Sequence, residues 1–310
     1  MRKILSILGP TASGKKEIAK LLLDRFGEKI HFISCDSRKI YRYMDIGTAK
    51  PPRDMRKFYS LLDIKNPDEA FSAGEFAREV EKIIPEIEKN DKIPIIIGGT
   101  PLYYKALFEG LFEEPRKKTE IREKILRRLE EEGIETLYRE LKVVDPQAAS
   151  KIHPNDWIRI TRALEVYYTL NIPLTEAQKK LKKPPKYKPL YIGIIMTREL
   201  LYQKINERTE RMFKEGLVEE TRQILDMGYS QRLPSLNTIG YREVIQYLNG
   251  DITMDEAKRL TAKKTRIYSR RQEYFFRSFD DVKWFDVSRG FNEVFDFLVT
   301  LIEKILHEEV

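Results

Sequence analysis

The chain has 310 residues and carries 57 Lys and Arg against 49 Asp and Glu, a net charge of +8. With 41% hydrophobic and 34% charged residues, its composition is typical of a folded globular protein and excludes a disordered chain. No run of about 20 apolar residues occurs, which excludes a membrane-spanning helix. A single cysteine, Cys35, excludes an internal disulfide and, without an export signal, favours the cytoplasm.

The predicted elements alternate between strands and helices. The apolar stretch 3–9 predicts a buried strand, and the apolar positions within 14–26 follow a helical spacing. A second strand is expected at 30–35, an amphipathic helix at 73–90, and a third strand, buried on both faces, at 93–97. Further on we expect a charge-dense helical region at 116–169, a Lys- and Pro-rich linker at 179–189, a strand at 191–197, and mostly helices from 199 onward.

This alternation predicts an α/β fold with a parallel sheet and with ligands bound at the carboxyl ends of its strands. We expect three segments: a core from 1 to 114, a mainly helical insertion with its linker from 115 to 189, and a returning core strand followed by a basic helical region from 190 to 310.

The segment 9–15, Gly-Pro-Thr-Ala-Ser-Gly-Lys, lies between the first strand and the first helix, as a phosphate-binding loop does. Its backbone amides and the helix N-terminus favour anions, and Lys15 adds a point charge. The next residue is Lys16, where such loops carry a hydroxyl that meets Mg²⁺. The metal ligands therefore stay open among Thr11, Ser13, Asp36 and water. The candidate residues for binding a diphosphate or a nucleotide are Gly9, Pro10, Thr11, Ala12, Ser13, Gly14, Lys15 and Lys16.

Polar residues also follow the second and third predicted strands. Asp36 and Ser37 come after the second strand, and Thr100 comes after the third. At the carboxyl edge of the sheet, a carboxylate can accept a proton from a nucleophile or hold a metal, and Thr100 can orient it by a hydrogen bond. Capping of a turn is the alternative role for Asp36. No strand ends in the aspartate typical of an ordinary ATPase.

The basic excess is concentrated in two segments. Residues 258–277 hold eight Lys or Arg against one acid, and residues 179–188 hold six Lys and no acid. Aromatic residues that could stack on bases lie in or next to the first segment. This pattern favours a nucleic-acid partner, and a solvated helix face with its aromatics in the core is the alternative. The aromatic residues are Tyr268, Tyr274, Phe275, Phe276 and Phe279.

Several strings along the chain resemble one enzyme family, the tRNA dimethylallyltransferases, or IPP transferases. They are GPTASGK (9–15), DSRKIYRYMDIGTAKP (36–51), GGTPLYYKAL (98–107), HPNDWIRITRALEV (153–166), NTIGYRE (237–243) and SRRQEYFFR (269–277). The resemblance implies a P-loop NTPase-like core with an inserted, mostly helical tRNA-binding domain. It also implies transfer of a dimethylallyl group from dimethylallyl diphosphate to the exocyclic amine of the adenosine beside the anticodon, position 37, with release of diphosphate.

By the same resemblance, Asp36 is the general base, Thr100 is its partner, and Arg122 lies near the reacting groups. The implied partners are the anticodon stem-loop of tRNA and dimethylallyl diphosphate, with Mg²⁺ as the cofactor. We expect a monomer that does not associate with a membrane. The residues implied to meet tRNA are Asp36, Ser37, Arg38, Lys39, Ile158, Arg159, Ile160, Thr161, Arg162, Asn237, Thr238, Ile239, Gly240, Tyr241, Arg242, Arg270, Arg271 and Gln272.

The chain departs from the family at Lys16, usually Thr or Ser, and at Arg38 and Lys39, usually uncharged. Two other functions stay open on the residues alone: a nucleotide kinase, which would give the basic segment no role, and an RNA-binding NTPase.

Several further side chains have an expected structural role. We expect Cys35 to lie in the core and Trp157 and Trp284 to have packing roles. Without the family resemblance we expect packing of Tyr241 and Arg242 as well. Surface ion pairs with Asp156 or Glu165 are the alternative to RNA or diphosphate contacts for Arg159 and Arg162.

Overall fold

The computed structural model describes residues 1–110, 112 and 119–307 and divides into two compact units. Unit 1 comprises Met1–Phe108 and Lys186–Val310, and unit 2 comprises Glu109–Pro185. The first predicted border, between 114 and 115, and the predicted start of the helical region at 116 lie outside the described residues. The second division falls between 185 and 186, whereas the sequence placed it between 189 and 190. None of the described helices is long and apolar enough to cross a membrane.

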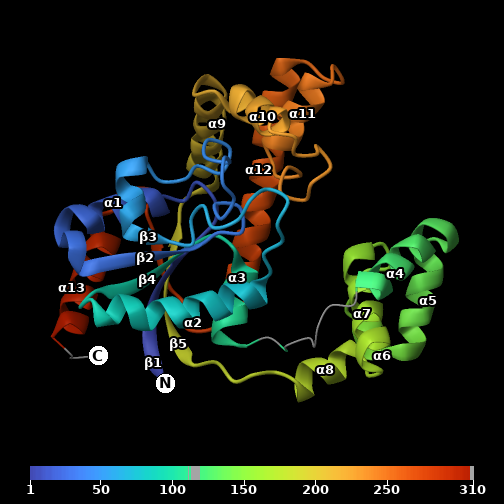
Figure 1. The fold of residues 1–310 in the computed structure, drawn as a ribbon. Helices are drawn as coiled ribbons and strands as arrows, with labels where there is room; N and C mark the ends of the chain where they lie inside the picture. The colour runs from blue at the N-terminus through green and yellow to red at the C-terminus, as the bar shows by residue number, and fades with distance from the viewer. Residues whose placement is uncertain (111, 113–118, 308–310) are drawn as a thin grey trace. The chain divides into compact units, whose positions relative to one another are not determined.

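Unit 1 contains a six-stranded sheet, which confirms the predicted α/β class. The strands are β1 (Arg2–Leu8), β2 (Ile30–Cys35), β3 (Tyr59–Ser60), β4 (Ile93–Gly98), β5 (Tyr187–Ile195) and β6 (Lys283–Asp286). They pair in the order β3-β2-β4-β1-β5-β6, and every pairing is parallel (Figure 1). The register places Leu8 and Cys35 both opposite Gly98. Residues that follow β1, β2 and β4 therefore emerge together at the carboxyl edge.

Helices cover the sheet and extend from it. Those of unit 1 are α1 (Lys15–Phe26), α2 (Ala73–Lys89), α3 (Pro101–Phe108), α9 (Arg198–Lys214), α10 (Leu217–Asp226), α11 (Tyr241–Leu248), α12 (Met254–Phe276) and α13 (Asn292–Leu306). Short 3₁₀ turns occupy Gly27–Lys29 and Arg53–Phe58. A core cluster joins α1 and α13 to one sheet face through residues such as Leu5 and Ile7. Ile4 and Leu8 are equally buried, so the opposite face of β1 is also covered, as expected for a parallel sheet.

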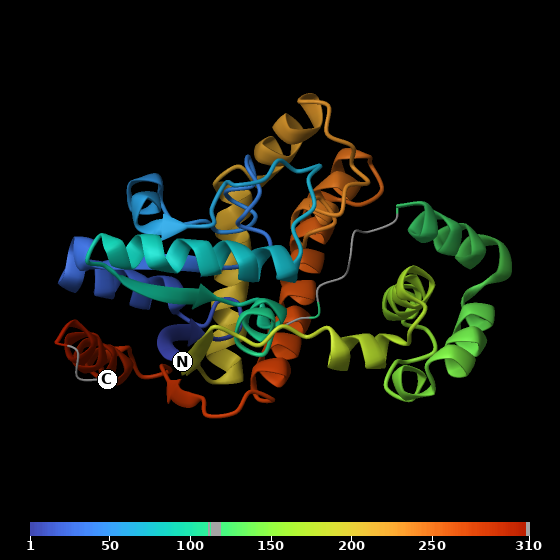
Figure 2. The same ribbon diagram turned by 60° about the horizontal axis from the view of Figure 1, so that its bottom comes forward.

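A second core cluster lies away from the sheet. It joins the loop that follows β2 to α9, α10, α11 and α12, with Met44, Leu217 and Tyr241 among its buried members. Figure 2 shows α9 and α12 running side by side, and the two helices are in contact. This cluster ties the loop after β2 to the basic C-terminal helices.

The described part of unit 2 has helices, one isolated antiparallel bridge between Phe112 and Lys182, and its own core. Its helices are α4 (Thr119–Glu132), α5 (Ile134–Val144), α6 (Pro146–Ala149), α7 (Trp157–Leu170) and α8 (Leu174–Lys180). Ile125, Leu137, Leu141 and Leu164 are buried together between them. The predicted linker 179–189 therefore overlaps the end of α8 and the start of β5.

Candidate active site

The segment 9–15 forms the strand-to-helix loop that its sequence predicts, between β1 and α1. Ala12 and Gly14 have positive φ angles of 64° and 99°, and Gly14 is the residue that caps α1. A Cβ on Gly14 would lie 2.5 Å from the ring of Phe291, so a larger residue has no room there. Left-handed residues in a loop that precedes a helix are typical of anion-binding turns. In this structure the amides of Thr11 and Ser13 donate to Gln272 Oε1 and to the Pro10 carbonyl.

Lys15 lies within this loop rather than pointing into solvent. Its Nζ donates to the carbonyl oxygens of Gly9 at 2.8 Å and Pro10 at 2.6 Å, and lies 3.4 Å from Ser13 Oγ. Burial lowers the pKa of this ammonium to about 7, and the nearby charge of Lys39 adds to the effect. An anion bound at the loop would favour the charged form of Lys15 again, because opposite charges raise the pKa of an amine.

Asp36 follows β2 at the same edge of the sheet. Its Oδ1 accepts hydrogen bonds from the backbone amides of Arg38 at 2.9 Å and Lys39 at 3.4 Å. The turn-capping role that the sequence left as an alternative is therefore present. It occupies one carboxylate oxygen, and Oδ2 has no hydrogen bond among the described residues, so proton acceptance and capping are compatible.

Thr100 supports Asp36 through the neighbouring backbone rather than through the carboxylate. Its Oγ1 accepts from the backbone amide of Ser37 at 3.1 Å, and its own amide donates to the Cys35 carbonyl at 3.2 Å. The expected hydrogen bond to the Asp36 carboxylate is therefore wrong: Thr100 holds the backbone beside it. The Cys35 side chain is fully buried, as predicted.

Sequence reasoning missed Arg208, which α9 brings to the loop. Its Nη1 donates to Thr11 Oγ1 at 3.1 Å. Burial lowers the pKa of the guanidinium, while the nearby charge of Asp36 acts in the opposite direction. Burial also lowers the pKa of Lys39. Arg208 is one arginine in a charge-rich helix, and no local pattern in the sequence distinguishes it from its neighbours.

Gln272, predicted to meet tRNA, also reaches the loop. It is 5% exposed, and its Oε1 accepts from the Thr11 amide at 2.8 Å while its Nε2 donates to the Gly99 carbonyl. An RNA contact by this buried side chain is therefore wrong for this structure. The neighbouring Arg270 and Arg271 are exposed on α12 and have no ion pair within the described chain.

The aromatic residues of the basic segment separate into two groups. Phe276 and Phe279 are buried and Phe275 packs against Phe279, so the expected stacking role is wrong for these three. Tyr268 is 41% exposed and Tyr274 is 84% exposed, which leaves both rings accessible.

The NTIGYRE string contributes exposed and buried residues. Asn237 is exposed, and its side chain accepts from Arg242 Nη1 at 3.2 Å. Tyr241 is fully buried, so an RNA contact by its side chain is wrong here and the packing alternative holds. A Cβ on Gly47 would lie 2.3 Å from the Tyr241 ring, which explains the glycine in the DIGTAK string. Thr238 and Ile239 are partly exposed, and Gly240 is buried.

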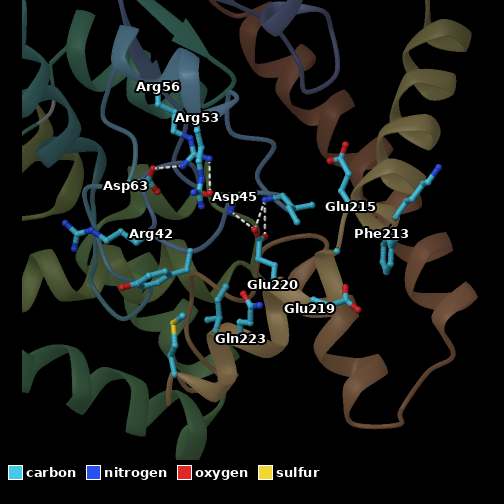
Figure 3. Close-up of a pocket in the computed structure, with 16 residues that line it drawn as sticks. Arg42, Asp45, Arg53, Arg56, Asp63, Phe213, Glu215, Glu219, Glu220 and Gln223 are labelled. Carbon is cyan, nitrogen blue, oxygen red and sulfur yellow. Dashed lines mark hydrogen bonds and ion pairs between the residues drawn. The ribbon is translucent and has the colours of Figure 1, made fainter.

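A second missed residue, Glu220 on α10, fastens the loop after β2. Its carboxylate accepts from the backbone amides of Asp45, Ile46 and Gly47 at 2.8–3.1 Å, and from the Tyr241 hydroxyl at 2.6 Å. Figure 3 shows Glu220 and Asp45 on the wall of a cavity of about 860 Å³. Three backbone amides converging on one carboxylate fix the loop that begins at Asp36.

Buried charges strengthen the same loop. Lys50 is fully buried at its side chain and pairs with Asp45 at 2.8 Å and Asp63 at 2.5 Å. Arg56 bridges the other oxygens of the same two aspartates, at 2.8 and 3.1 Å (Figure 3). Because each carboxylate meets two cations, removal of one partner would leave a charge poorly compensated.

The remaining predicted site residues belong to unit 2 and are described within it. Arg122 is exposed on α4, and Ile158 is exposed on α7. Ile160 is fully buried, so an RNA contact by its side chain is wrong. Thr161 is partly exposed and donates to the Ile158 carbonyl at 3.2 Å. The proximity of Arg122 to the reacting groups stays a prediction.

The two arginines of α7 form ion pairs with the two acidic residues that the sequence named, although Glu165 is buried rather than at the surface. Arg159 pairs with Asp156 at 3.3 Å, and Arg162 pairs with Glu165 at 3.0 Å. Of the two tryptophans, Trp157 is 47% exposed, so its expected packing is wrong. Trp284 packs closely against Gly193, as predicted.

The described residues do not form a complete cage of protein ligands for a metal. Among the described residues, no three His, Cys, Asp or Glu side chains gather in a way that could hold an ion. Lys16 is exposed at the position where a hydroxyl would meet Mg²⁺. The Lys15 ammonium lies 3.4 Å from Ser13 Oγ, so it stands beside one of the loop hydroxyls that the sequence left open as a metal ligand.

Comparison with known proteins identifies the family. The family model described as IPP transferase matches residues 39–279. A tRNA dimethylallyltransferase from Caldanaerobacter subterraneus subsp. tengcongensis is 42% identical over 291 residues, 92% of each chain. One from Geobacter sulfurreducens is 42% identical over 295 residues, 94% of each chain.

Solved structures agree with these relatives. The crystal structure of a tRNA isopentenylpyrophosphate transferase from Bacillus halodurans has a TM-score of 0.71 at 32% identity, covering 100% of this chain and 98% of that one. A eukaryotic dimethylallyltransferase acting on tRNA, 24% identical, shares the fold with a TM-score of 0.76 over 99% of this chain and 84% of its own. The chain therefore belongs to the IPP transferase family, the family of the tRNA dimethylallyltransferases, and is a transferase.

Proposed function

We propose that this enzyme transfers a dimethylallyl group from dimethylallyl diphosphate to the exocyclic amine of adenosine 37, next to the anticodon of tRNA, and releases diphosphate. The observation that carries the proposal is the meeting of three features at one sheet edge. These are the phosphate-binding loop with Lys15, the Asp36 carboxylate, and Arg208 in contact with the loop. We place the reaction in the cytoplasm and assign it to a monomer.

Asp36 is proposed to be the general base. An exocyclic adenine amine is a poor nucleophile, because its lone pair is delocalised into the ring. As the new C–N bond forms, the amine becomes acidic and must lose a proton to a nearby acceptor. Asp36 Oδ2 is suited to that role, since Oδ1 is fixed by the Arg38 and Lys39 amides. Thr100 keeps the Ser37 backbone, and with it the carboxylate, in place.

The loop and its cations are proposed to stabilise the leaving group. When the allylic C–O bond breaks, negative charge grows on the diphosphate. Loop amides, the Lys15 ammonium and the Arg208 guanidinium stabilise that charge where it develops. Burial of both cations, which lowers their pKa values, makes the site unfavourable for positive charge until an anion arrives.

Mg²⁺ stays in the proposal as a counter-ion that accompanies the diphosphate. Lys16 replaces the usual hydroxyl, and no group of three or more His, Cys, Asp or Glu side chains gathers among the described residues. We therefore propose that the diphosphate and water supply most of its ligands, with Thr11, Ser13 and Asp36 as the candidate protein contacts. None of the steps assigned to Asp36, Lys15 or Arg208 requires the metal.

The exposed face of α12 is proposed to bind the anticodon stem-loop. Arg270 and Arg271 lie three to four residues before Tyr274, so that all three share one side of the helix. Two guanidinium groups that form no ion pair with the described residues, beside an accessible ring, suit phosphates and an unstacked base. Asn237 and Arg242, and Ile158 of unit 2, are further proposed tRNA contacts. Contacts by Arg159 and Arg162 require that an RNA phosphate replace Asp156 and Glu165 as their partners. The target adenosine must leave its stack, which costs least in an RNA loop.

The direct test incubates the protein with unmodified tRNA and either dimethylallyl diphosphate or ATP, followed by mass spectrometry of the nucleosides. We expect one added five-carbon group on one adenosine when dimethylallyl diphosphate is supplied, and none when ATP is supplied instead. Consumption of ATP without RNA modification would instead favour a nucleotide kinase or an RNA-binding NTPase.

A further inference from the structure

Gln272 connects two backbone segments of the active site. Its Oε1 accepts from the amide of Thr11 in the phosphate-binding loop, and its Nε2 donates to the carbonyl of Gly99, directly before Thr100. The side chain is only 5% exposed. A Cβ on Gly99 would lie 2.7 Å from Nε2, so the backbone after β4 approaches the amide closely. One side chain thus holds the diphosphate loop against the residue that supports Asp36.

Few side chains can make both contacts. The site needs an acceptor for one amide and a donor for one carbonyl at the end of a chain of fixed length, which is the chemistry of a carboxamide. Thr11 is also held from α9, since Arg208 donates to its hydroxyl at 3.1 Å. The loop is therefore tied to both long helices that run beside each other, α9 and α12 (Figure 2).

Gln272 lies next in sequence to two residues of the proposed RNA-binding face of α12. It directly follows Arg270 and Arg271, whose exposed side chains are proposed to hold RNA. The buried and exposed sides of one helical turn thus face the diphosphate loop and the proposed RNA surface. A ligand that fixes α12 also fixes the carboxamide that holds Thr11 and Gly99.

We infer that Gln272 is a positioning residue that couples RNA binding on α12 to diphosphate binding at the loop, an inference that rests on the proposed function. Coupling between two sites is reciprocal: RNA should strengthen diphosphate binding by the same factor as diphosphate strengthens RNA binding. Gln272 thereby makes the loop best formed when both substrates are present.

The test measures the affinity of inorganic diphosphate by calorimetry, alone and with a saturating unmodified anticodon stem-loop RNA. In the wild type we expect the RNA to tighten diphosphate binding by about fivefold or more, the lower end of common coupling factors. Gln272→Met keeps the side-chain length but makes neither hydrogen bond. We expect its coupling factor to fall to within about twofold of one, with RNA affinity in the absence of diphosphate unchanged.

A matched control is Gln246→Met on α11, a partly buried glutamine that has no contact with the loop among the described residues. Its coupling factor should equal that of the wild type. Gln272→Glu keeps an acceptor for Thr11 but loses the donor for Gly99, and it should also lose the coupling, which keeps the test decisive if Gln272→Met does not fold.

The outcomes separate this inference from the proposed function. Wild-type coupling retained in a folded Gln272 variant, or no coupling in the wild type, would overturn the inference even where tRNA is prenylated. Absence of prenylation by the wild-type enzyme would instead overturn the proposed function.

Discussion

The charge state of Lys15 should control the pH dependence of diphosphate binding. Burial, together with the nearby Lys39 charge, lowers the pKa of the free enzyme's Lys15 from 10.5 to about 7. Bound diphosphate stabilises the ammonium, so binding should take up a proton wherever free Lys15 is neutral. At pH 8 about nine-tenths of Lys15 is neutral in the free enzyme, and the contribution of Lys15 to affinity should fall about 50-fold between pH 7 and pH 9.

Calorimetry in two buffers of different ionisation enthalpy measures the proton uptake directly. Lys15→Arg is the control, because a guanidinium stays charged throughout this range. Inorganic diphosphate also changes its own protonation in this pH range, and it does so equally with both proteins. The difference in proton uptake between the wild type and Lys15→Arg therefore reports Lys15 alone. We expect the wild type to take up close to one proton more than Lys15→Arg at pH 8. Equal uptake by both proteins, or parallel pH profiles, would refute the argument.

The lowered pKa of Lys15 also makes the free energy of unfolding depend on pH. The direction of that dependence follows from whether the folded or the unfolded state binds more protons. In the unfolded chain Lys15 titrates near 10.5, whereas in the ligand-free folded enzyme it titrates near 7. Between these values the unfolded state binds the additional proton, so the contribution of Lys15 to the free energy of unfolding rises with pH across this window. Saturation with diphosphate should reduce this rise, since the ligand keeps Lys15 charged in the folded state.

Four further predictions concern other parts of the molecule. Asp36→Asn should lower the single-turnover rate by about 10²–10⁴ with tRNA affinity little changed, and a near-normal rate would remove Asp36 as the base. Lys16→Thr should keep activity within a few-fold while shifting the Mg²⁺ optimum in an activity titration, whereas a loss as large as that from removing the preceding loop lysine would make Lys16 a principal phosphate ligand. Changing Arg270 and Arg271 together to Ala should weaken tRNA binding in a filter-binding assay and leave diphosphate affinity unchanged. The slope of log tRNA affinity against log salt concentration should become shallower by up to about two units. An unaltered slope would mean that both arginines belong to a solvated helix face. Glu220→Ala leaves three backbone amides and a hydroxyl without their acceptor and should lower the free energy of unfolding by about 3 kcal/mol in urea titrations; a loss below about 0.5 kcal/mol would contradict the role of this carboxylate.

Much of the sheet could be predicted because its strands are continuous apolar runs. The stretch 30–35 matches β2, and the short run 93–97 matches β4 except for its final glycine. β3 has two residues and β6 has four, too few for a pattern to appear in the sequence. The predicted strand 191–197 begins four residues later than β5, because Tyr187–Leu190 contains Lys and Pro. Pairing with β1 extends β5 across these residues.

The candidate site was predictable only where its residues lie next to the strands in sequence. The loop and Asp36 follow β1 and β2 directly, so local pattern was sufficient to find them. Arg208 and Gln272 come from helices about 200 and 260 residues further along the chain than Thr11, which they contact. Their roles depend on how α9 and α12 pack, which no local spacing encodes. Trp157 is misplaced for a related reason, because hydrophobicity alone does not say which side of a helix is covered.

The pairing of β1 with β5 has a consequence for synthesis of the chain on the ribosome. Residues Arg2–Leu8 pair with Tyr187–Gly193, across an interval that contains the whole of unit 2. Until that segment leaves the ribosome, one edge of β1 has no native partner, and unpaired strand edges invite aggregation. Unit 2, by contrast, has a core made from its own helices and can fold before the sheet around it is complete. The nascent protein should therefore acquire its helical insertion first and its diphosphate loop last, when β5 and then β6 close the sheet.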